Sequence, residues 1–224
     1  MFDQFDPADD KMLQVIDNNG KVISKELMPK LSDDEMLKLY KDMLFVRTLD
    51  HMIVSYQRQG RVYTYPPNYG QEAIGVAAGA VLRHEDWLVP AFRELGAWLA
   101  KGVSVKEVFM FNMGFEDGMR FTEANHVLPF SVPIASQLIH AAGIGYAIKY
   151  RKKDEVAMAF VGDGGTSEGD FHEALNFAGV WKVPVIFVVQ NNQYAISVPV
   201  KMQTASINMA IKSKAYGIKG IKVD

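Results

Sequence analysis

Residues 155–192 read EVAMAFVGDGGTSEGDFHEALNFAGVWKVPVIFVVQNN, two apolar runs separated by a glycine-rich turn and a helical pattern. The runs 155–161 and 183–189 predict buried strands, and the apolar spacing of 168–181 predicts a helix between them. A strand, a helix and a strand within about 35 residues form a βαβ unit, which implies parallel strands and a right-handed crossover. The sequence therefore predicts an α/β fold with a parallel sheet flanked by helices.

Polar residues follow both predicted strands, GDGG after the first and QNNQY after the second. Ligands of parallel sheets bind at the carboxyl ends of the strands, so Asp163 and Asn192 are expected to converge there. An aspartate would repel phosphate unless a cation lay between them. One carboxylate and one amide oxygen suit Mg²⁺, which also binds phosphate oxygens. Gly162, Gly164 and Gly165 would then let the backbone approach the phosphates closely, beside a helix N-terminus near Ser167.

Three other interpretations of this turn are less favoured or excluded. Asp163 could be a solvated acid in a tight strand-to-helix turn, but the asparagine pair after the next strand argues against this. A nicotinamide dinucleotide site would need G-x-G-x-x-G spacing, and an acid where this chain has amides. A P-loop is excluded because no Gly-Lys-Ser/Thr follows the turn.

GDG followed by NN at this spacing resembles the thiamine diphosphate signature. From about residue 30 onward the chain resembles the alpha subunit of the first, decarboxylating component of 2-oxo acid dehydrogenase complexes, of the pyruvate dehydrogenase type. Further matching stretches are YGQEAIGVAAGAVL, VPAFRELG, SQLIHAAGIGYAIKY and GIKVD. The resemblance implies a thiamine diphosphate-binding domain over 31–224. Family chains continue beyond GIKVD, so it also implies truncation at the C-terminal side.

The resemblance assigns the cofactor and metal contacts to individual residues. Asp163, Asn192 and the backbone carbonyl of Tyr194 would bind Mg²⁺, and the three glycines of GDGG would lie against the diphosphate. Phe92 and Arg93 stand where the family commonly has Tyr-Arg, with the arginine at a phosphate oxygen. Ile134 would lie beneath the bent thiamine.

The resemblance also implies partners and a substrate. The family's activating glutamate belongs to a beta subunit, so no catalytic residue is assigned in this chain, and a heterotetramer of two alpha and two beta subunits is expected. The acyl group would pass to the lipoyl-bearing acyltransferase component. Gln190 stands where branched-chain relatives commonly carry arginine, which favours pyruvate over branched-chain 2-oxo acids or acetoin. A noncatalytic cofactor-binding or assembly fragment remains the alternative, because the C-terminal part of the family chain is missing.

The N-terminal part shows a different organisation. Residues 1–30 are predicted to form an extended arm, with NNG at 18–20 as a hairpin turn. Ser32 and Glu35 form a capping-box pattern at the start of a long helix that Gly60 would end. A small-residue helix is expected at 70–82, and a long irregular loop at 112–133.

Composition limits the class of protein. Lys and Arg together number 24 and Asp and Glu 26, so no basic surplus indicates nucleic acid as a partner. No apolar run approaches the ~20 residues of a membrane span, the N-terminus lacks signal-peptide features, and Cys is absent. A cytoplasmic protein is therefore expected. The five histidines lack metal-ligand spacing. Glu72 is expected to be a helix-start acid, His172 a packing or exposed residue, and His126 a loop residue that could reach the site.

Overall fold

The structure is a computed structural model, and it describes residues 4–224. Its helices of the α type are α1 Asp33–Arg58, α2 Glu72–Val81, α3 Leu95–Ala100, α4 Val105–Asn112, α5 Ser136–Tyr150, α6 Gly169–Trp181 and α7 Val200–Gln203. Short 3-10 turns are η2 Pro7–Asp9, η3 Glu116–Met119, η4 Asp163–Ser167 and η5 Ala210–Tyr216. The strands are β1 Met12–Leu13, β2 Trp87–Val89, β3 Ala157–Gly162, β4 Val185–Gln190, β5 Tyr194–Ala195, β6 Val198–Pro199 and β7 Lys222–Val223.

The central sheet has the order β2-β3-β4, and all three strands run parallel. Helix α6 connects β3 to β4, as the sequence pattern predicted, so the βαβ unit is confirmed. The register pairs Leu88 with Met158, and Ala159 with Phe187. These pairings bring the carboxyl ends of the three strands to the same edge of the sheet.

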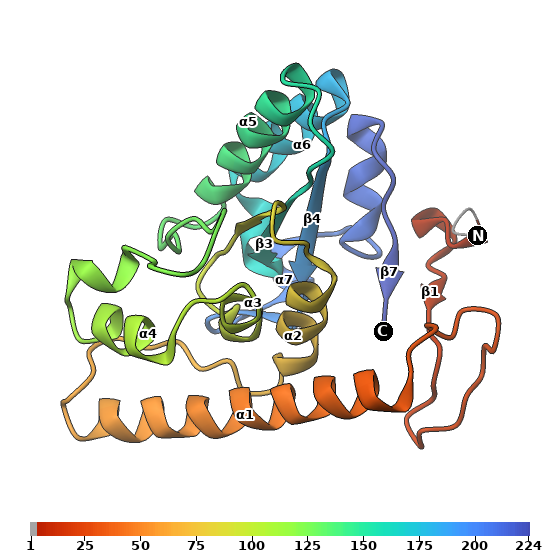
Figure 1. Ribbon diagram of the computed structural model, residues 1–224. Helices are drawn as coiled ribbons and strands as arrows, with labels where there is room; N and C mark the ends of the chain where they lie inside the picture. The colour runs from red at the N-terminus through yellow and green to blue at the C-terminus, as the bar shows by residue number, and fades with distance from the viewer. Residues whose placement is uncertain (1–3) are drawn as a thin grey trace.

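Helices cover both faces of the sheet (Figure 1), because β3 presents apolar side chains to both faces. Its side chains alternate between the two faces, and all are apolar. Met158 and Phe160 pack in a core with residues of α1 to α4, whereas Ala159 and Val161 pack in a second core with residues of α5 and α6. A strand buried on both faces needs a continuous apolar run. The predicted α/β fold class is confirmed.

The loop before α5 extends the sheet in a way that the sequence pattern did not indicate. The Leu88 amide donates to the His126 carbonyl at 2.9 Å, and the Leu128 amide donates to the Leu88 carbonyl at 3.0 Å. Residues 126–128 therefore lie beside β2 as a short parallel neighbour. The loop is otherwise irregular, apart from η3.

Helix α2 lies close to α3 because its small residues leave room. A Cβ atom added to Gly79 would lie 2.5 Å from the Ala100 Cβ, and one added to Gly96 would lie 2.8 Å from the Val76 amide nitrogen. Both distances are shorter than a carbon atom tolerates, so these glycines permit the close helix pairing. The small-residue helix expected at 70–82 is confirmed.

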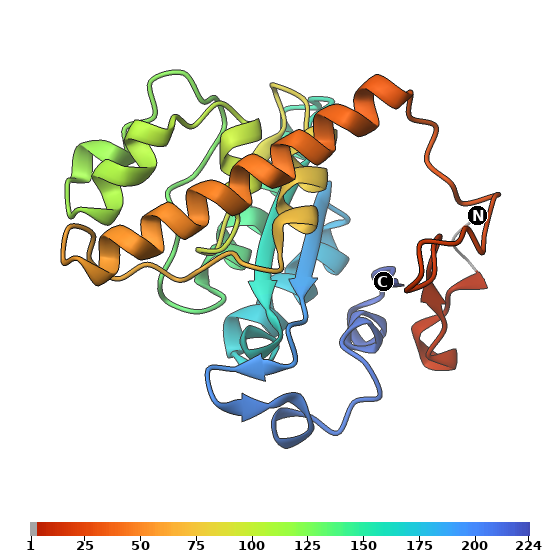
Figure 2. The ribbon, with the colours of Figure 1, turned by 90° about the horizontal axis from the view of Figure 1, so that it is seen from below.

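Long helix α1 crosses beneath the body of the molecule (Figure 2). It begins with the predicted capping box: the Ser32 hydroxyl accepts from the Glu35 amide, and the Glu35 carboxylate accepts from the Ser32 amide. Gly60, with φ +71°, follows the end of the helix as expected. The hairpin turn before it is also present, with Ile16 bridging Val22 in antiparallel fashion.

The two ends of the described chain lie side by side. Strand β1 pairs in parallel with β7, Met12 opposite Lys222 (Figure 1). The division of the chain into an arm, 1–30, and a domain, 31–224, stays a prediction. Across residues 4–224, no helix is both long and apolar enough to cross a membrane.

Candidate functional site

The candidate site lies at the carboxyl ends of β3 and β4, where Gly162 pairs with Gln190. Turn η4 starts directly after β3 and turns the chain into α6. After β4, the chain forms the hairpin β5–β6 and the single turn α7, which pack against η4. The GDGG turn is therefore in contact with residues 194–203, which come later in the chain, after β4.

Asp163 is the first residue of η4 and is 1% exposed. Its Oδ2 accepts a hydrogen bond from the Gln203 side-chain amide at 3.1 Å. Its Oδ1 is buried and has no hydrogen-bond partner among residues 4–224. A buried carboxylate oxygen without a partner is costly. A cation at this atom would remove that cost, so the residue fits a metal site.

A lysine holds the other end of the same turn. The Thr166 hydroxyl donates to the Asp163 carbonyl at 2.8 Å, and Thr166 is fully buried. The Lys212 ammonium donates to the Thr166 carbonyl at 2.8 Å and to its hydroxyl oxygen at 2.9 Å. Burial lowers the pKa of Lys212 from its ordinary value. Lys212 therefore fixes η4 from the segment at 210–216.

The glycines of the turn allow close approach of neighbouring segments. A Cβ added to Gly164 would lie 2.6 Å from the Ala195 Cβ, and one added to Gly165 would lie 2.3 Å from Val161 Cγ2. The same added atom at Gly165 would lie 3.1 Å from the Ile134 side chain. The structure thus brings the predicted site residue Ile134 to the GDGG turn. Gly162 faces open space.

Asn192 belongs to a tight turn after β4. Its Oδ1 accepts from the Tyr194 amide at 3.0 Å, and the Asn191 Oδ1 accepts from the Gln193 amide at 3.1 Å. Gln193 adopts φ +73° within this turn. Asn192 and Tyr194 therefore form one local unit at the same sheet edge as Asp163. Among the described contacts, neither residue forms a direct hydrogen bond with Asp163.

Phe92 and Arg93 follow β2, so they lie at the same edge of the sheet. The Arg93 guanidinium donates to the Pro67 carbonyl and lies 5.7 Å from the centre of the Phe92 ring. Burial lowers the pKa of Arg93. Next to it, the fully buried Glu94 carboxylate accepts from the Arg93 amide at 3.0 Å. Burial raises the pKa of Glu94 to about 7.

A buried polar network supports the turn that bears Arg93. The Asp50 Oδ1 accepts from the Tyr65 hydroxyl at 2.7 Å and from the Asn68 amide at 2.6 Å. The Asn68 Oδ1 in turn accepts from the Leu95 amide at 3.0 Å. These bonds tie α1 and the loop before α2 to the start of α3, and the pattern of the sequence did not indicate them.

Two other titratable residues, Glu72 and His172, lie in different surroundings. Glu72 starts α2, and the Arg47 guanidinium donates to it, which lowers the pKa of the Glu72 carboxyl. His172 is hydrogen-bonded to the Tyr216 hydroxyl at 2.6 Å. The expected nature of both residues, a helix-start acid and a packing residue, agrees with these contacts.

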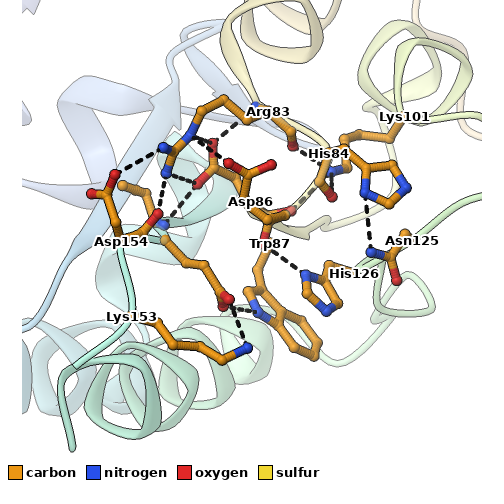
Figure 3. Close-up of polar contacts among 12 residues, drawn as sticks. Arg83, His84, Asp86, Trp87, Lys101, Asn125, His126, Lys153 and Asp154 are labelled. Atoms are coloured by element: carbon orange, nitrogen blue, oxygen red, sulfur yellow. Dashed lines mark hydrogen bonds and ion pairs between the residues drawn. The ribbon is translucent and has the colours of Figure 1, made fainter. Parts of the chain in front are cut away.

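His126 is not at the site. Its ring stacks on Trp87 with centroids 4.3 Å apart, and its Nδ1 donates to the Glu85 carbonyl at 2.7 Å (Figure 3). Trp87 is the first residue of β2, so this pair lies at the amino end of the strand, away from η4. The idea that His126 reaches the site is wrong, because the loop at 126–128 is paired to β2.

Across residues 4–224, no cluster of three or more His, Cys, Asp or Glu side chains could hold a metal ion.

Comparison with known proteins shows the family of the chain that carries this site. Residues 40–224 match the family described as the dehydrogenase E1 component. This chain belongs to the dehydrogenase E1 component family. The resemblance that the GDG and NN motifs indicated is thereby confirmed.

Two relatives illustrate the degree of similarity. The pyruvate dehydrogenase E1 component subunit alpha of Staphylococcus aureus (strain Mu50) is 42% identical over 214 residues, and that of Staphylococcus epidermidis (strain ATCC 35984) is 40% identical over 214 residues. Each comparison covers 96% of this chain and 58% of the relative. The chain therefore spans little more than half the length of these relatives.

Among solved structures, a putative thiamin diphosphate-dependent enzyme from Mycobacterium smegmatis is similar with a TM-score of 0.43 and 19% identity. The match covers 70% of this chain and 26% of that one. A similarity this low adds nothing to the assignment.

Proposed function

We propose that this chain is the alpha-subunit part of a thiamine diphosphate- and Mg²⁺-dependent enzyme that oxidatively decarboxylates pyruvate. One observation carries the proposal: Asp163 presents a buried carboxylate oxygen without a partner, at the sheet edge where Asn192 also lies. Membership of the dehydrogenase E1 component family, and relatives that are pyruvate dehydrogenase alpha subunits, support it.

In this proposal the metal is held by oxygen atoms of η4 and of the turn after β4. Asp163 supplies a carboxylate, Asn192 a side-chain amide oxygen and Tyr194 a backbone carbonyl oxygen. Such a set leaves positions for phosphate oxygens, as Mg²⁺ prefers. The hydrogen bond from the Tyr194 amide to Asn192 supports the idea that these two residues act as one unit.

The diphosphate would lie against Gly162, Gly164 and Gly165. Gly162 is exposed, and an atom added there meets nothing within 4 Å, so the backbone is accessible to a ligand. Arg93 would supply a cation to a phosphate oxygen from the end of β2, and Phe92 would pack beside it. Ile134, next to Gly165, would support the cofactor from below. When bound, thiamine diphosphate supplies the electron sink for decarboxylation, and the chain's part is to bind and orient it.

The acetyl group would be transferred to the lipoyl domain of the acyltransferase component. A beta subunit would complete the site in a heterotetramer, in a cytoplasmic protein. Gln190 supports pyruvate as the 2-oxo acid, because branched-chain relatives commonly carry arginine at this position. Gln190 is buried, and its amide nitrogen has no partner in the described part of the chain.

Calorimetric titration of the chain with thiamine diphosphate and Mg²⁺, with and without a beta subunit, tests this function. We expect Mg²⁺-dependent binding, and release of CO₂ from pyruvate faster than from 2-oxoisovalerate once both subunits are present. Absence of binding in both arms would overturn the proposal. Binding without CO₂ release would favour a noncatalytic cofactor-binding fragment, and a preference for 2-oxoisovalerate a branched-chain enzyme.

A further inference from the structure

The Asp163 carboxylate is oriented by one side chain from a distant part of the sequence. Gln203, the last residue of α7, donates its amide to Asp163 Oδ2 at 3.1 Å. The same nitrogen lies 3.3 Å from the Val198 carbonyl, to which it also donates. The two acceptors fix the direction of the amide. Asp163 is left with one engaged oxygen and one buried oxygen without a partner within residues 4–224.

The position of Gln203 follows from close packing of its segment on η4. Ala195 in β5 lies against Gly164 so closely that a Cβ there would be 2.6 Å from the Ala195 Cβ. The hairpin β5–β6 then leads directly into α7. Because the hairpin and α7 are in contact with the turn, the Gln203 side chain lies within hydrogen-bonding distance of Asp163. The contact is thus part of how η4 is assembled.

We propose that Gln203 is a positioning residue for the metal: it holds Oδ2 of Asp163 and so directs Oδ1 toward the cation. This inference rests on the proposed function and assigns to Gln203 a role in metal affinity. A carboxylate can rotate about its last side-chain bond, and a donor to one oxygen restricts that rotation. Loss of such an outer hydrogen bond typically weakens metal binding by about 10–100-fold.

A purely structural hydrogen bond is the competing explanation, and the two differ in what they predict. A structural bond would affect folding stability, and it would affect cofactor affinity equally at every Mg²⁺ concentration. A positioning bond would change the Mg²⁺ concentration that is required, and excess Mg²⁺ would restore cofactor affinity because Asp163 is still present.

The decisive variant is Gln203→Leu, which removes the donor while keeping a similar volume. In the full chain purified with its beta subunit, thiamine diphosphate binding is titrated by calorimetry over a series of Mg²⁺ concentrations. Direct binding of Mn²⁺ is followed by the electron paramagnetic resonance signal of the free ion. We expect the half-saturating Mg²⁺ concentration and the Mn²⁺ dissociation constant to rise by about 10–100-fold. At saturating Mg²⁺, cofactor affinity should return to within a few-fold of the wild type.

Met202→Leu is the matched control, because Met202 precedes Gln203 in α7 and is 74% exposed. It should leave both metal constants unchanged. An unchanged Mg²⁺ requirement in Gln203→Leu, or a loss of cofactor affinity that excess Mg²⁺ does not restore, would overturn the role of Gln203. If the wild-type chain bound neither Mn²⁺ nor the cofactor, the proposed function itself would fail instead. Circular dichroism of each variant checks that it is folded.

Discussion

Asp163 combines two features that rarely occur together in a stable protein. It is buried, and only one of its carboxylate oxygens has a hydrogen bond among the described contacts. Such a group contributes little to folding in the absence of a ligand, because its desolvation offsets its one hydrogen bond. A ligand bound at the free oxygen would supply the missing interaction.

We expect Asp163→Ala to abolish Mg²⁺-dependent binding of thiamine diphosphate. The free energy of unfolding without ligand should change by no more than about 1 kcal/mol, because one hydrogen bond and one unsatisfied oxygen are removed together. Calorimetric titration and urea unfolding measure the two quantities. Glu173→Ala, which removes an exposed acid from α6, should change neither. Cofactor binding by Asp163→Ala equal to the wild type would contradict the metal site.

Glu94 makes folding stability depend on pH. Burial raises the pKa of its carboxyl from an ordinary 4.5 to about 7, so the folded state holds this proton more tightly than the unfolded state. The resulting stability is complete below pH 4.5 and is lost as the pH rises to about 7. The loss is on the order of 3 kcal/mol.

Glu94→Gln should remove this contribution. The difference in the free energy of unfolding, variant minus wild type, should increase between pH 4.5 and 7.5 and be constant above. Urea unfolding at several pH values measures it. A difference that is independent of pH would show that Glu94 is ionised in the folded protein at neutral pH.

At the scale of elements, the turn between β3 and α6 is built by glycines that serve different purposes. Gly165 is required by packing, since an added Cβ would lie 2.3 Å from Val161 Cγ2. Gly162 has open space around it and extended backbone angles, which any residue can adopt. Its small size has no packing reason in the chain alone, which is expected if a ligand occupies that space.

This distinction predicts opposite results for two similar substitutions. Gly165→Ala should lower the free energy of unfolding by about 1–3 kcal/mol because it overpacks the core. Gly162→Ala should leave that free energy nearly unchanged but weaken thiamine diphosphate binding. Thermal unfolding and calorimetry separate the two effects. Full cofactor affinity in a folded Gly162→Ala variant would show that the diphosphate lies elsewhere.

For the whole molecule, residues 6–13 support the segment 208–223, which contacts the GDGG turn through Lys212. Besides the β1–β7 pairing, the Asn208 amide donates to the Pro7 carbonyl at 2.8 Å, and Lys214 forms an ion pair with Asp6 at 2.6 Å. Lys212, which holds Thr166, lies between these two anchors in the sequence. The arm and the candidate site are therefore connected through 208–216.

Deleting residues 1–30 should increase amide hydrogen exchange in 208–223, because the segment loses its pairing partner. Exchange in α1 should stay as it is, since the capping box at Ser32 is retained. Mass spectrometry of peptides after exchange measures both regions. Equal protection of 208–223 with and without the arm would show that this segment is held by α6 and η4 alone.

Most elements could be predicted from local patterns. The two apolar runs indicated β3 and β4, and the Ser32 capping pattern is present as a capping box. These features depend on residues a few positions apart, so periodicity and end residues suffice to find them. Pairing of 126–128 with β2 escaped this approach because no alternating pattern marks such a short segment.

The candidate site was likewise only partly predictable from local sequence patterns. GDGG and QNN each stand at the end of a predicted strand. A parallel sheet brings the carboxyl ends of its strands to one edge, so the pattern alone predicted that the two motifs lie near each other. It did not predict the partners of Asp163 and Thr166. Gln203 lies 40 residues from Asp163 and Lys212 lies 46 from Thr166, and neither stands in a motif. Which side chain completes a buried carboxylate depends on how distant segments pack, and that is settled only when the chain is folded.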